Sequence, residues 1–378
     1  FQAILNSISL GQIKTNELIS NRFSINNAFE AYETLMNDRK SLGILLSYPK
    51  KSLFKTKITI KQNNKLLANK NVVIGFIGSG NYASSFLLPS FKKTGAILKT
   101  IVSNDGLSST HFGNKFGFEN VSTDIKDIME DSDCNTVVIC TRHDSHADLI
   151  CNGLSHNKNI FVEKPICIKL KELEQINKIY NSDKIFMVGF NRRFAPLSYK
   201  LKNLISRLNT PKSYIYTCNA GYIDKDHWIH NINIGGGRLI GEACHFVDYL
   251  RFLDNSKIIK MKILFNSNSN NKDNFTLNLE FESGSIGNVH YFSNGSKSFP
   301  KERIEIFGDN KIIMMENFKK LRTWGFNINK KENNIKSDKG QERCTHEFVD
   351  AIRKGSQSPI NFLEIIETQK LIFDLDSI

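Results

Sequence analysis

The stretch Val72-Val73-Ile74-Gly75-Phe76-Ile77-Gly78-Ser79-Gly80-Asn81-Tyr82-Ala83 decides the fold of this chain. An apolar run leads directly into a turn with the spacing GxGxxA, which is typical of dinucleotide-binding sites. The first glycine permits the tight turn, the second lets a pyrophosphate approach the backbone, and the small alanine lets the helix pack closely on the strand. A helix that begins near Asn81 would also point its amides at the phosphates. The stretch therefore predicts a dinucleotide site; the alternative is a glycine turn without a ligand.

Short apolar runs and helical segments alternate from residue 71 to about 188. The runs that we interpret as strands are 72–77, 97–102, 136–140, 159–162 and 184–188. This alternation predicts an α/β fold with a doubly wound parallel sheet, the Rossmann arrangement.

The pattern changes after residue 188. A helical stretch at 196–208 is followed by longer β-rich runs, which are 213–221, 258–265, 275–281, 285–292, 303–307 and 311–315. An amphipathic helix at 241–252 interrupts these runs, and further helices end the chain. We therefore predict a second, α+β domain over 189–378, with an open and mainly antiparallel sheet that binds substrate and supports a homo-oligomer.

The N-terminal part of the chain differs from both domains. Residues 1–49 alternate helix and strand, with a helix at 25–36 and a strand at 42–46. Residues 50–70 are basic and polar, with one short β-like run at 58–60, and we interpret them as a linker.

The composition limits the classes of protein to which the chain can belong. Its 378 residues suit two domains or slightly more, and no apolar stretch is long enough to span a bilayer. The seven cysteines are odd in number and form no CxxC pair, so we expect reduced thiols, no metal and a cytoplasmic location. The net charge of +13 is dispersed, which favours attraction of dinucleotides or acidic sugars over binding to nucleic acid. We expect no membrane partner.

The end of the second strand bears on the choice of cofactor. A ribose-binding carboxylate commonly ends this strand, but here Ser103 and Asn104 follow it, and Asp105 comes later. Ser103 and Asn104 can bond a ribose hydroxyl or tolerate a 2′-phosphate, whereas we expect Asp105 to be solvated. The cofactor is therefore NAD or NADP, with NAD slightly favoured.

Three later strand ends carry reactive side chains. The segment 141–146 follows one strand, Glu163-Lys164-Pro165 follows the next, and 189–194 follows the last. The carboxyl ends of parallel strands are where such folds bind ligands. The Lys164 ammonium can polarise a substrate hydroxyl or relay its proton, and the Lys-Pro peptide is a candidate for the cis form. His146 opens a helix and has either a packing role or a cofactor contact.

The helix at 241–252 carries the second candidate group. Glu242 and His245 are three residues apart and share one helical face. A histidine suits the transfer of a hydroxyl proton; the alternative is a histidine whose hydrogen bonds are satisfied within the helix. His227 is a further candidate for substrate contact.

Together these motifs resemble the Gfo/Idh/MocA oxidoreductase family over about residues 71–378. The likeness rests on the GxGxxA turn, the Glu-Lys-Pro tripeptide, the string GFNRRF and the Gly-rich His-x-x-Asp helix. It implies a nicotinamide cofactor and a sugar, cyclitol or sugar-nucleotide substrate. By this resemblance Lys164 is the active-site lysine and His245 the proton-transfer histidine. The family often has Asp four residues before that histidine, where this chain has Gly241 followed by Glu242.

Residues 1–49 are instead similar to the C-terminal end of a medium-chain, zinc-alcohol-dehydrogenase-like domain, through LISNRF and AFEAY. The string GGGRLIGEACHFVD resembles two-part fusions of these families that are associated with surface polysaccharides. We therefore expect a truncated fusion that lacks the first half's own cofactor and zinc sites.

The predicted site has three groups of residues. The catalytic group is Lys164, His245 and Glu242. The cofactor group is Gly78, Ser79, Gly80, Asn81, Tyr82, Ser103, Asn104, Thr141, His143, His146, Glu163, Lys164, Asn191 and Arg192. The substrate group is Lys164, Arg192, His227, Trp228, Arg238 and His245. The predicted function is an NAD(P)-dependent oxidoreductase; a cofactor-bound regulator, an NAD-dependent glycosidase and a non-catalytic interaction domain are the alternatives.

Overall fold

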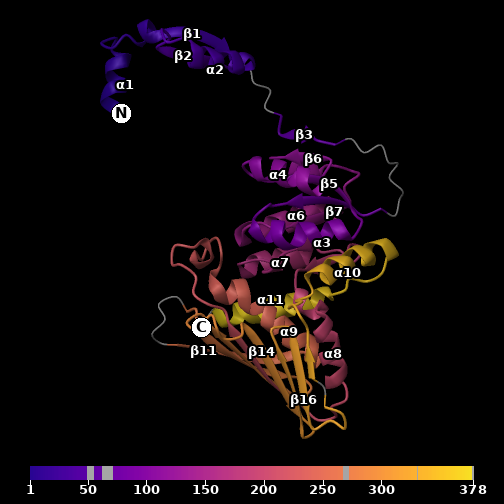
Figure 1. Cartoon of the computed structure of the whole chain (residues 1–378). Helices are drawn as coiled ribbons and strands as arrows, with labels where there is room; N and C mark the ends of the chain where they lie inside the picture. The colour runs from indigo at the N-terminus through magenta and orange to yellow at the C-terminus, as the bar shows by residue number, and fades with distance from the viewer. Residues whose placement is uncertain (49–54, 62–70, 267–271, 330, 377–378) are drawn as a thin grey trace. The chain divides into compact units, whose positions relative to one another are not determined.

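The computed structural model describes residues 1–48, 55–61, 71–266, 272–329 and 331–376. Contacts divide the chain into two compact units, Phe1–Lys55 and Thr56–Ile378. Figure 1 shows the elements of both units.

The first unit is a small parallel β-α-β arrangement with almost no core. Its main elements are α1 (Gln2–Ser9), β1 (Ile19–Ser24), α2 (Ala28–Asn37) and β2 (Gly43–Ser47), with β1 parallel to β2. Among its described residues only Ala31 is buried, whereas Phe29 and Leu42 are 80% and 79% exposed. Parallel strands normally need apolar cover on both faces, so this unit does not form a packed core of its own.

The second unit begins with a seven-stranded sheet in the order β3-β6-β5-β4-β7-β8-β9. The strands are β3 (Lys57–Thr59), β4 (Val73–Ile77), β5 (Ile97–Val102), β6 (Asn120–Ser122), β7 (Thr136–Ile139), β8 (Asn159–Val162) and β9 (Phe186–Val188). All pair in parallel except β3, which is antiparallel to β6. Every residue of β4, β7 and β8 is buried, because helices cover both faces of such a sheet. The helices of this part are α3 (Leu88–Lys93), α4 (Leu107–Phe116), α5 (Lys126–Met129), α6 (His146–Ser155) and α7 (Leu170–Ile179).

Of the segment predicted as a linker, 50–70, only residues 55–61 lie in the part of the chain that the structure describes. Its residues 57–59 form β3, and Ile60 packs against the core. A polar run can take this place because an edge strand needs only one paired side and one covered face. The short strand β6 was not predicted, since three residues give too little alternation to detect.

The rest of the second unit is built on an eight-stranded sheet in the order β11-β12-β13-β10-β14-β15-β16-β17. Its strands are β10 (Ser213–Asn219), β11 (Ile258–Phe265), β12 (Phe275–Phe281), β13 (Ile286–Phe292), β14 (Glu302–Gly308), β15 (Lys311–Glu316), β16 (Lys320–Trp324) and β17 (Lys331–Asn333). Only the β10–β13 pair is parallel. Burial alternates along β10 and β12, as expected for a sheet with one covered face. The predicted Rossmann sheet and antiparallel second sheet are thus confirmed.

Helices cover the buried face of this sheet. They are α8 (Pro196–Ile205), α9 (Cys244–Asp254) and α11 (Phe362–Asp376), whereas α10 (Gln341–Lys354) packs against α3 of the Rossmann domain. In Figure 1 α9 and α11 lie above the orange strands, and α9 contacts β13 while α11 contacts β11.

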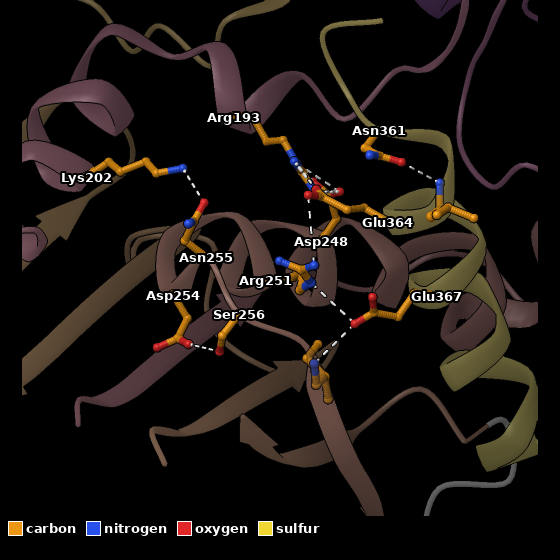
Figure 2. A network of polar contacts seen from close by, with 12 residues as sticks. Arg193, Lys202, Asp248, Arg251, Asp254, Asn255, Ser256, Asn361, Glu364 and Glu367 are labelled. Carbon is orange, nitrogen blue, oxygen red and sulfur yellow. Dashed lines mark hydrogen bonds and ion pairs between the residues drawn. The ribbon is translucent and has the colours of Figure 1, made fainter. Parts of the chain in front are cut away.

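A buried ion-pair network fixes the position of α9 (Figure 2). Arg193, which follows β9, donates three hydrogen bonds of 2.7–3.0 Å to Asp248 on α9. It also donates to Glu364 on α11 at 2.8 Å. Burial raises the pKa of Asp248 to about 6. Because removing one partner of a buried pair leaves an uncompensated charge, this network holds α9 against the end of the Rossmann sheet.

Candidate active site

The glycine turn has the geometry that a dinucleotide requires. Gly78 has φ +94°, and a Cβ there would lie 2.3 Å from the carbonyl oxygen of Cys140, so only glycine fits. A Cβ on Gly80 would meet no atom within 4 Å, which leaves open space beside the backbone. Ala83 is fully buried where the helix meets the sheet. The residues present therefore fit a pyrophosphate at Gly80, at the switch between β4 and β7.

The end of β5 carries a hydrogen-bonded carboxylate. Asp105 is exposed, as predicted, but it accepts hydrogen bonds from the hydroxyls of Ser103 at 3.1 Å and Ser108 at 3.0 Å. Ser108 in turn accepts from Ser79 of the glycine turn at 2.7 Å. The hydrogen bonds from Ser108 and then Ser103 lower the pKa of Asp105. A negative charge is thereby held next to the turn, while Asn104 is exposed and makes no contact that defines a site.

Lys164 reaches from the Rossmann sheet to the second domain. The Lys164–Pro165 peptide is cis, as the sequence indicated. The Lys164 ammonium donates to the carbonyl oxygen of Gly241 at 3.0 Å. Its neighbour Glu163 is buried, and burial raises the pKa of Glu163 to about 7. Lys164 thus stands at the entrance to the helix that carries Glu242 and His245.

His245 is buried, and its Nδ1 has no hydrogen-bond partner among the described residues. Burial, together with the positive charges of Arg192 and Lys164, holds the pKa of His245 well below its ordinary value. The ring is therefore neutral at pH 7 and able to accept a proton. An unpartnered polar atom in the interior is rare, so this nitrogen is suited to a ligand.

Glu242 is held in place by two side chains. Its carboxylate accepts from the hydroxyl of Tyr291 on β13 at 2.6 Å and from Nε of Arg238 at 3.2 Å. Burial alone would raise the pKa of Glu242, but the charges of Lys164 and Arg238 outweigh burial and lower it. Sequence reasoning missed Tyr291, because its position on a buried strand face carries no motif.

The two histidines after β7 have different surroundings. His143 contacts the backbone oxygen of Gly235 through Nδ1 at 2.8 Å, and burial lowers its pKa to about 3. His146 is fully buried, with its two ring nitrogens 2.7 Å and 3.3 Å from the carbonyl oxygens of Pro165 and Thr141. His146 therefore ties the ends of these strands together, as the packing alternative predicts, and its cofactor contact stays a prediction.

Arg192 and Asn191, for which ligand contacts are predicted, both have partners within the protein. Arg192 is buried and forms a bidentate ion pair with Glu302 on β14, at 2.7 Å and 3.0 Å. Asn191 donates to the backbone oxygen of Lys339 at 2.8 Å. Both partners belong to the second domain, so these two side chains connect the end of β9 to that domain. The bonds to Glu302 use Nε and Nη2 of Arg192, and its contact with a cofactor or substrate stays a prediction.

The remaining predicted residues surround the same region. Arg238 is buried and joins Glu242 to the backbone oxygen of Gly221 at 2.8 Å. His227 and Trp228 lie in the loop that follows Gly221. Thr141 lies 2.6 Å from the hydroxyl of Ser145. Asn81 is exposed and Tyr82 is 36% exposed at the start of the helix after the glycine turn.

The described residues contain neither a membrane-spanning helix nor a cluster of metal ligands. No described helix is long and apolar enough to cross a membrane. Likewise, in the part of the chain that the structure describes, no group of three or more His, Cys, Asp or Glu side chains is arranged to hold a metal ion. The seven cysteines are all free.

Comparison with known proteins assigns both halves of the second unit. Residues 72–190 match the Gfo/Idh/MocA oxidoreductase family, NAD-binding Rossmann fold, and residues 211–314 match the C-terminal domain of the same family. The chain contains both domains of the Gfo/Idh/MocA oxidoreductase family. The first domain supplies the glycine turn and Lys164, and the second supplies Glu242, His245 and Tyr291.

Relatives in this family include named dehydrogenases. Myo-inositol 2-dehydrogenase of Thermotoga maritima is 26% identical over 218 residues, which are 54% of this chain and 63% of that protein. The scyllo-inositol 2-dehydrogenase (NAD(+)) of Bacillus subtilis is 30% identical over 186 residues, or 46% and 53% of the two chains. The chain thus spans between half and two-thirds of the length of these curated relatives.

Solved structures show the same fold. Levoglucosan dehydrogenase in complex with NADH and levoglucosan has a TM-score of 0.72 at 18% sequence identity, covering 81% of this chain and 96% of that one. At this identity the likeness concerns the fold.

Proposed function

We propose that the protein is an NAD(P)-dependent dehydrogenase or reductase that acts on a CH–OH group of a sugar, cyclitol or sugar nucleotide. The observation that carries this proposal is the buried, unpartnered Nδ1 of His245 in the site that Lys164 enters. The names of the inositol and levoglucosan dehydrogenases that resemble this chain support it.

Lys164, His245 and Glu242 have separate roles at the reacting hydroxyl. The Lys164 ammonium, which has further donors beside the one bonded to Gly241, binds and polarises the hydroxyl oxygen. The neutral His245 accepts the hydroxyl proton. Glu242, kept ionised by Lys164 and Arg238, balances the charge of the lysine. A bound nicotinamide supplies the hydride chemistry, and the glycine turn holds its dinucleotide.

The carboxylate of Asp105 favours NAD. It lies beside the glycine turn through Ser108 and Ser79, and a negative charge there repels the 2′-phosphate of NADP.

We also propose that the open sheet pairs with a second copy of the chain. Register places Ile286, Phe307, Ile312 and Trp324 in one row on the face that the helices leave open, with Ser213 of β10 between the first two. Ile286 is 50% exposed and Trp324 43%. Such a row of apolar side chains is typical of an interface.

For residues 1–48 we retain the interpretation as part of a medium-chain dehydrogenase-like domain, in a fusion associated with polysaccharide biosynthesis. The scarcity of buried residues in this unit supports its being part of a larger fold.

The experiment that tests the function combines binding with turnover. NADH and NADPH are titrated by nicotinamide fluorescence, and oxidation of inositols and sugars is followed by nicotinamide absorbance. We expect Gly80→Asp to abolish binding, and Lys164→Met to bind cofactor normally but lose turnover. Lys169→Met, whose side chain is 60% exposed, is the matched control. Normal turnover of Lys164→Met would contradict the proposal.

A further inference from the structure

A pocket of about 680 Å³ lies beside the active site and is not used by the chemistry described above. It is formed by Arg142, which follows β7, and by residues of the loop 221–236, notably Lys225, His227, Trp228 and His230. Its walls therefore come from both domains of the second unit.

The loop is anchored at both ends to residues of the candidate active site. Arg238, which pairs with Glu242, donates to the backbone oxygen of Gly221 at 2.8 Å. At the other end His143 contacts the backbone oxygen of Gly235 at 2.8 Å. Within the loop the carbonyl oxygen of Asn231 accepts from the backbone amides of residues 234, 235 and 236. These bonds hold the pocket in shape without a ligand, which reduces the ordering cost of binding.

The ring of His143 contacts both the pocket and the residue to which Lys164 is bonded. The His143 ring makes an edge contact with Trp228, with centroids 4.8 Å apart. The same ring lies against Gly241, whose oxygen accepts from Lys164: a Cβ at Gly241 would be 3.0 Å from Cε1 of His143. A molecule with its reacting hydroxyl at Lys164 can therefore extend past His143 onto Trp228.

The side chains that line the pocket suit a ligand in which an anionic group is attached to a ring. The Arg142 guanidinium is exposed, lies 5.9 Å from the Trp228 ring, and makes no ion pair in the described part of the chain. Lys225 is a second exposed cation of this pocket. Asp226 is the one carboxylate among its lining residues, so positive charge is in excess.

A buried polar atom adds independent support. Nε2 of His230 is buried and has no hydrogen-bond partner among the described residues, and the His230 side chain is only 10% exposed. A buried group of this kind calls for a partner. A ligand oxygen in the pocket supplies that partner.

We infer that this pocket binds a carboxylate or phosphate carried by the sugar-like substrate, while the indole of Trp228 contacts its ring. The substrate is then an acidic sugar derivative, a uronic acid or a sugar phosphate. This inference rests on the proposed function, because it places the reacting hydroxyl of the same molecule at Lys164. Arginine is well suited to both anions, since its planar donors match their oxygens.

The test uses the intrinsic fluorescence of Trp228. The chain has two tryptophans, so Trp324→Phe leaves Trp228 as the only one, and excitation selective for tryptophan then reports on Trp228. In this background, glucose, glucuronate and glucose 1-phosphate are titrated into the full chain. We expect saturable quenching by at least one of the two anions, with a Kd at least about tenfold below that of glucose and rising with salt. Glucuronate and glucose 1-phosphate distinguish the carboxylate from the phosphate.

Substitutions test whether Arg142 binds the anionic group of the ligand. Arg142→Gln is expected to raise the Kd of the charged ligand about tenfold, as the loss of a charge-assisted contact predicts. Arg207→Gln, at an exposed site on the surface, is the control and leaves that Kd unchanged. Equal quenching by glucose and the anions, no quenching by any of them, or an unchanged Kd in Arg142→Gln would each overturn the inference. NADH binding and the turnover of Lys164→Met, measured separately, decide the proposed function: if both are as expected and anion selectivity is absent, only the pocket assignment is removed.

Discussion

The ring of His143 lies directly against the backbone of Gly241, so a Cβ at position 241 would be 3.0 Å from its Cε1. The same Cβ would lie 3.1 Å from Cδ1 of Ile229. Position 241 is where the family resemblance leads one to expect an aspartate. In this chain the histidine fills that space, and the carboxylate of Glu242, one residue later, faces Tyr291 and Arg238 instead.

This contact makes a prediction for stability. Gly241→Asp is expected to lower the free energy of unfolding by ~1–3 kcal/mol, because the ring and Ile229 must move. Adding His143→Ala should recover at least half of the loss by opening space for the new side chain. Urea unfolding of the single and double variants measures both values. A single variant as stable as the wild-type chain would show that the contact is not tight.

Tyr291 is predicted to be a positioning residue for Glu242. Tyr291→Phe removes the 2.6 Å hydrogen bond and should lower kcat/KM by about tenfold, or ~1.4 kcal/mol. The acidic limb of the pH–rate profile should move to higher pH, because that hydrogen bond helps to lower the pKa of Glu242.

Tyr214→Phe is the matched control for that prediction. It removes another buried phenol–carboxylate bond, to Asp254 at 3.1 Å, without touching the site. We expect it to cost ~1 kcal/mol of stability and to leave kcat/KM unchanged. If both variants lost activity equally, a general packing defect would replace the positioning role.

Glu163 should make stability depend on pH. Burial raises its pKa from 4.5 to about 7, so the folded state keeps a proton that the unfolded state releases above pH 4.5. Stability is therefore expected to fall as pH rises from 4.5 to 7, by up to ~3 kcal/mol from this group. Glu163→Gln should flatten this part of the profile in urea unfolding at pH 5 and 7.5. An unchanged profile would mean that Glu163 is ionised throughout.

Asp105 should set the preference between the two cofactors. Asp105→Asn removes the negative charge beside the glycine turn and is expected to raise the affinity for NADPH relative to NADH by about tenfold. Fluorescence titration with both cofactors gives the ratio. Asp183→Asn, at an exposed turn, is the control. A ratio that stays constant in Asp105→Asn would remove this residue from cofactor recognition.

The fold could be predicted closely wherever one segment carries its own pattern. The strands 97–102, 159–162, 258–265 and 275–281 have the predicted bounds, because apolar runs or alternation between turn residues are local properties. The β-like run at 58–60 marks β3 in the sequence, but its pairing with β6 could not be predicted, since a short edge strand is defined by its neighbour.

The same distinction between local and tertiary information holds for the candidate site. From the sequence alone, the strand–turn–helix at Gly78, the lysine at a strand end and the histidine on a helix could be placed, because each depends on adjacent residues. Only the tertiary structure paired Glu242 with Tyr291, 49 residues away, and Arg192 with Glu302, 110 residues away. Burial decides whether a charged side chain seeks a ligand or a partner within the protein, and burial depends on packing between elements that the local sequence does not encode.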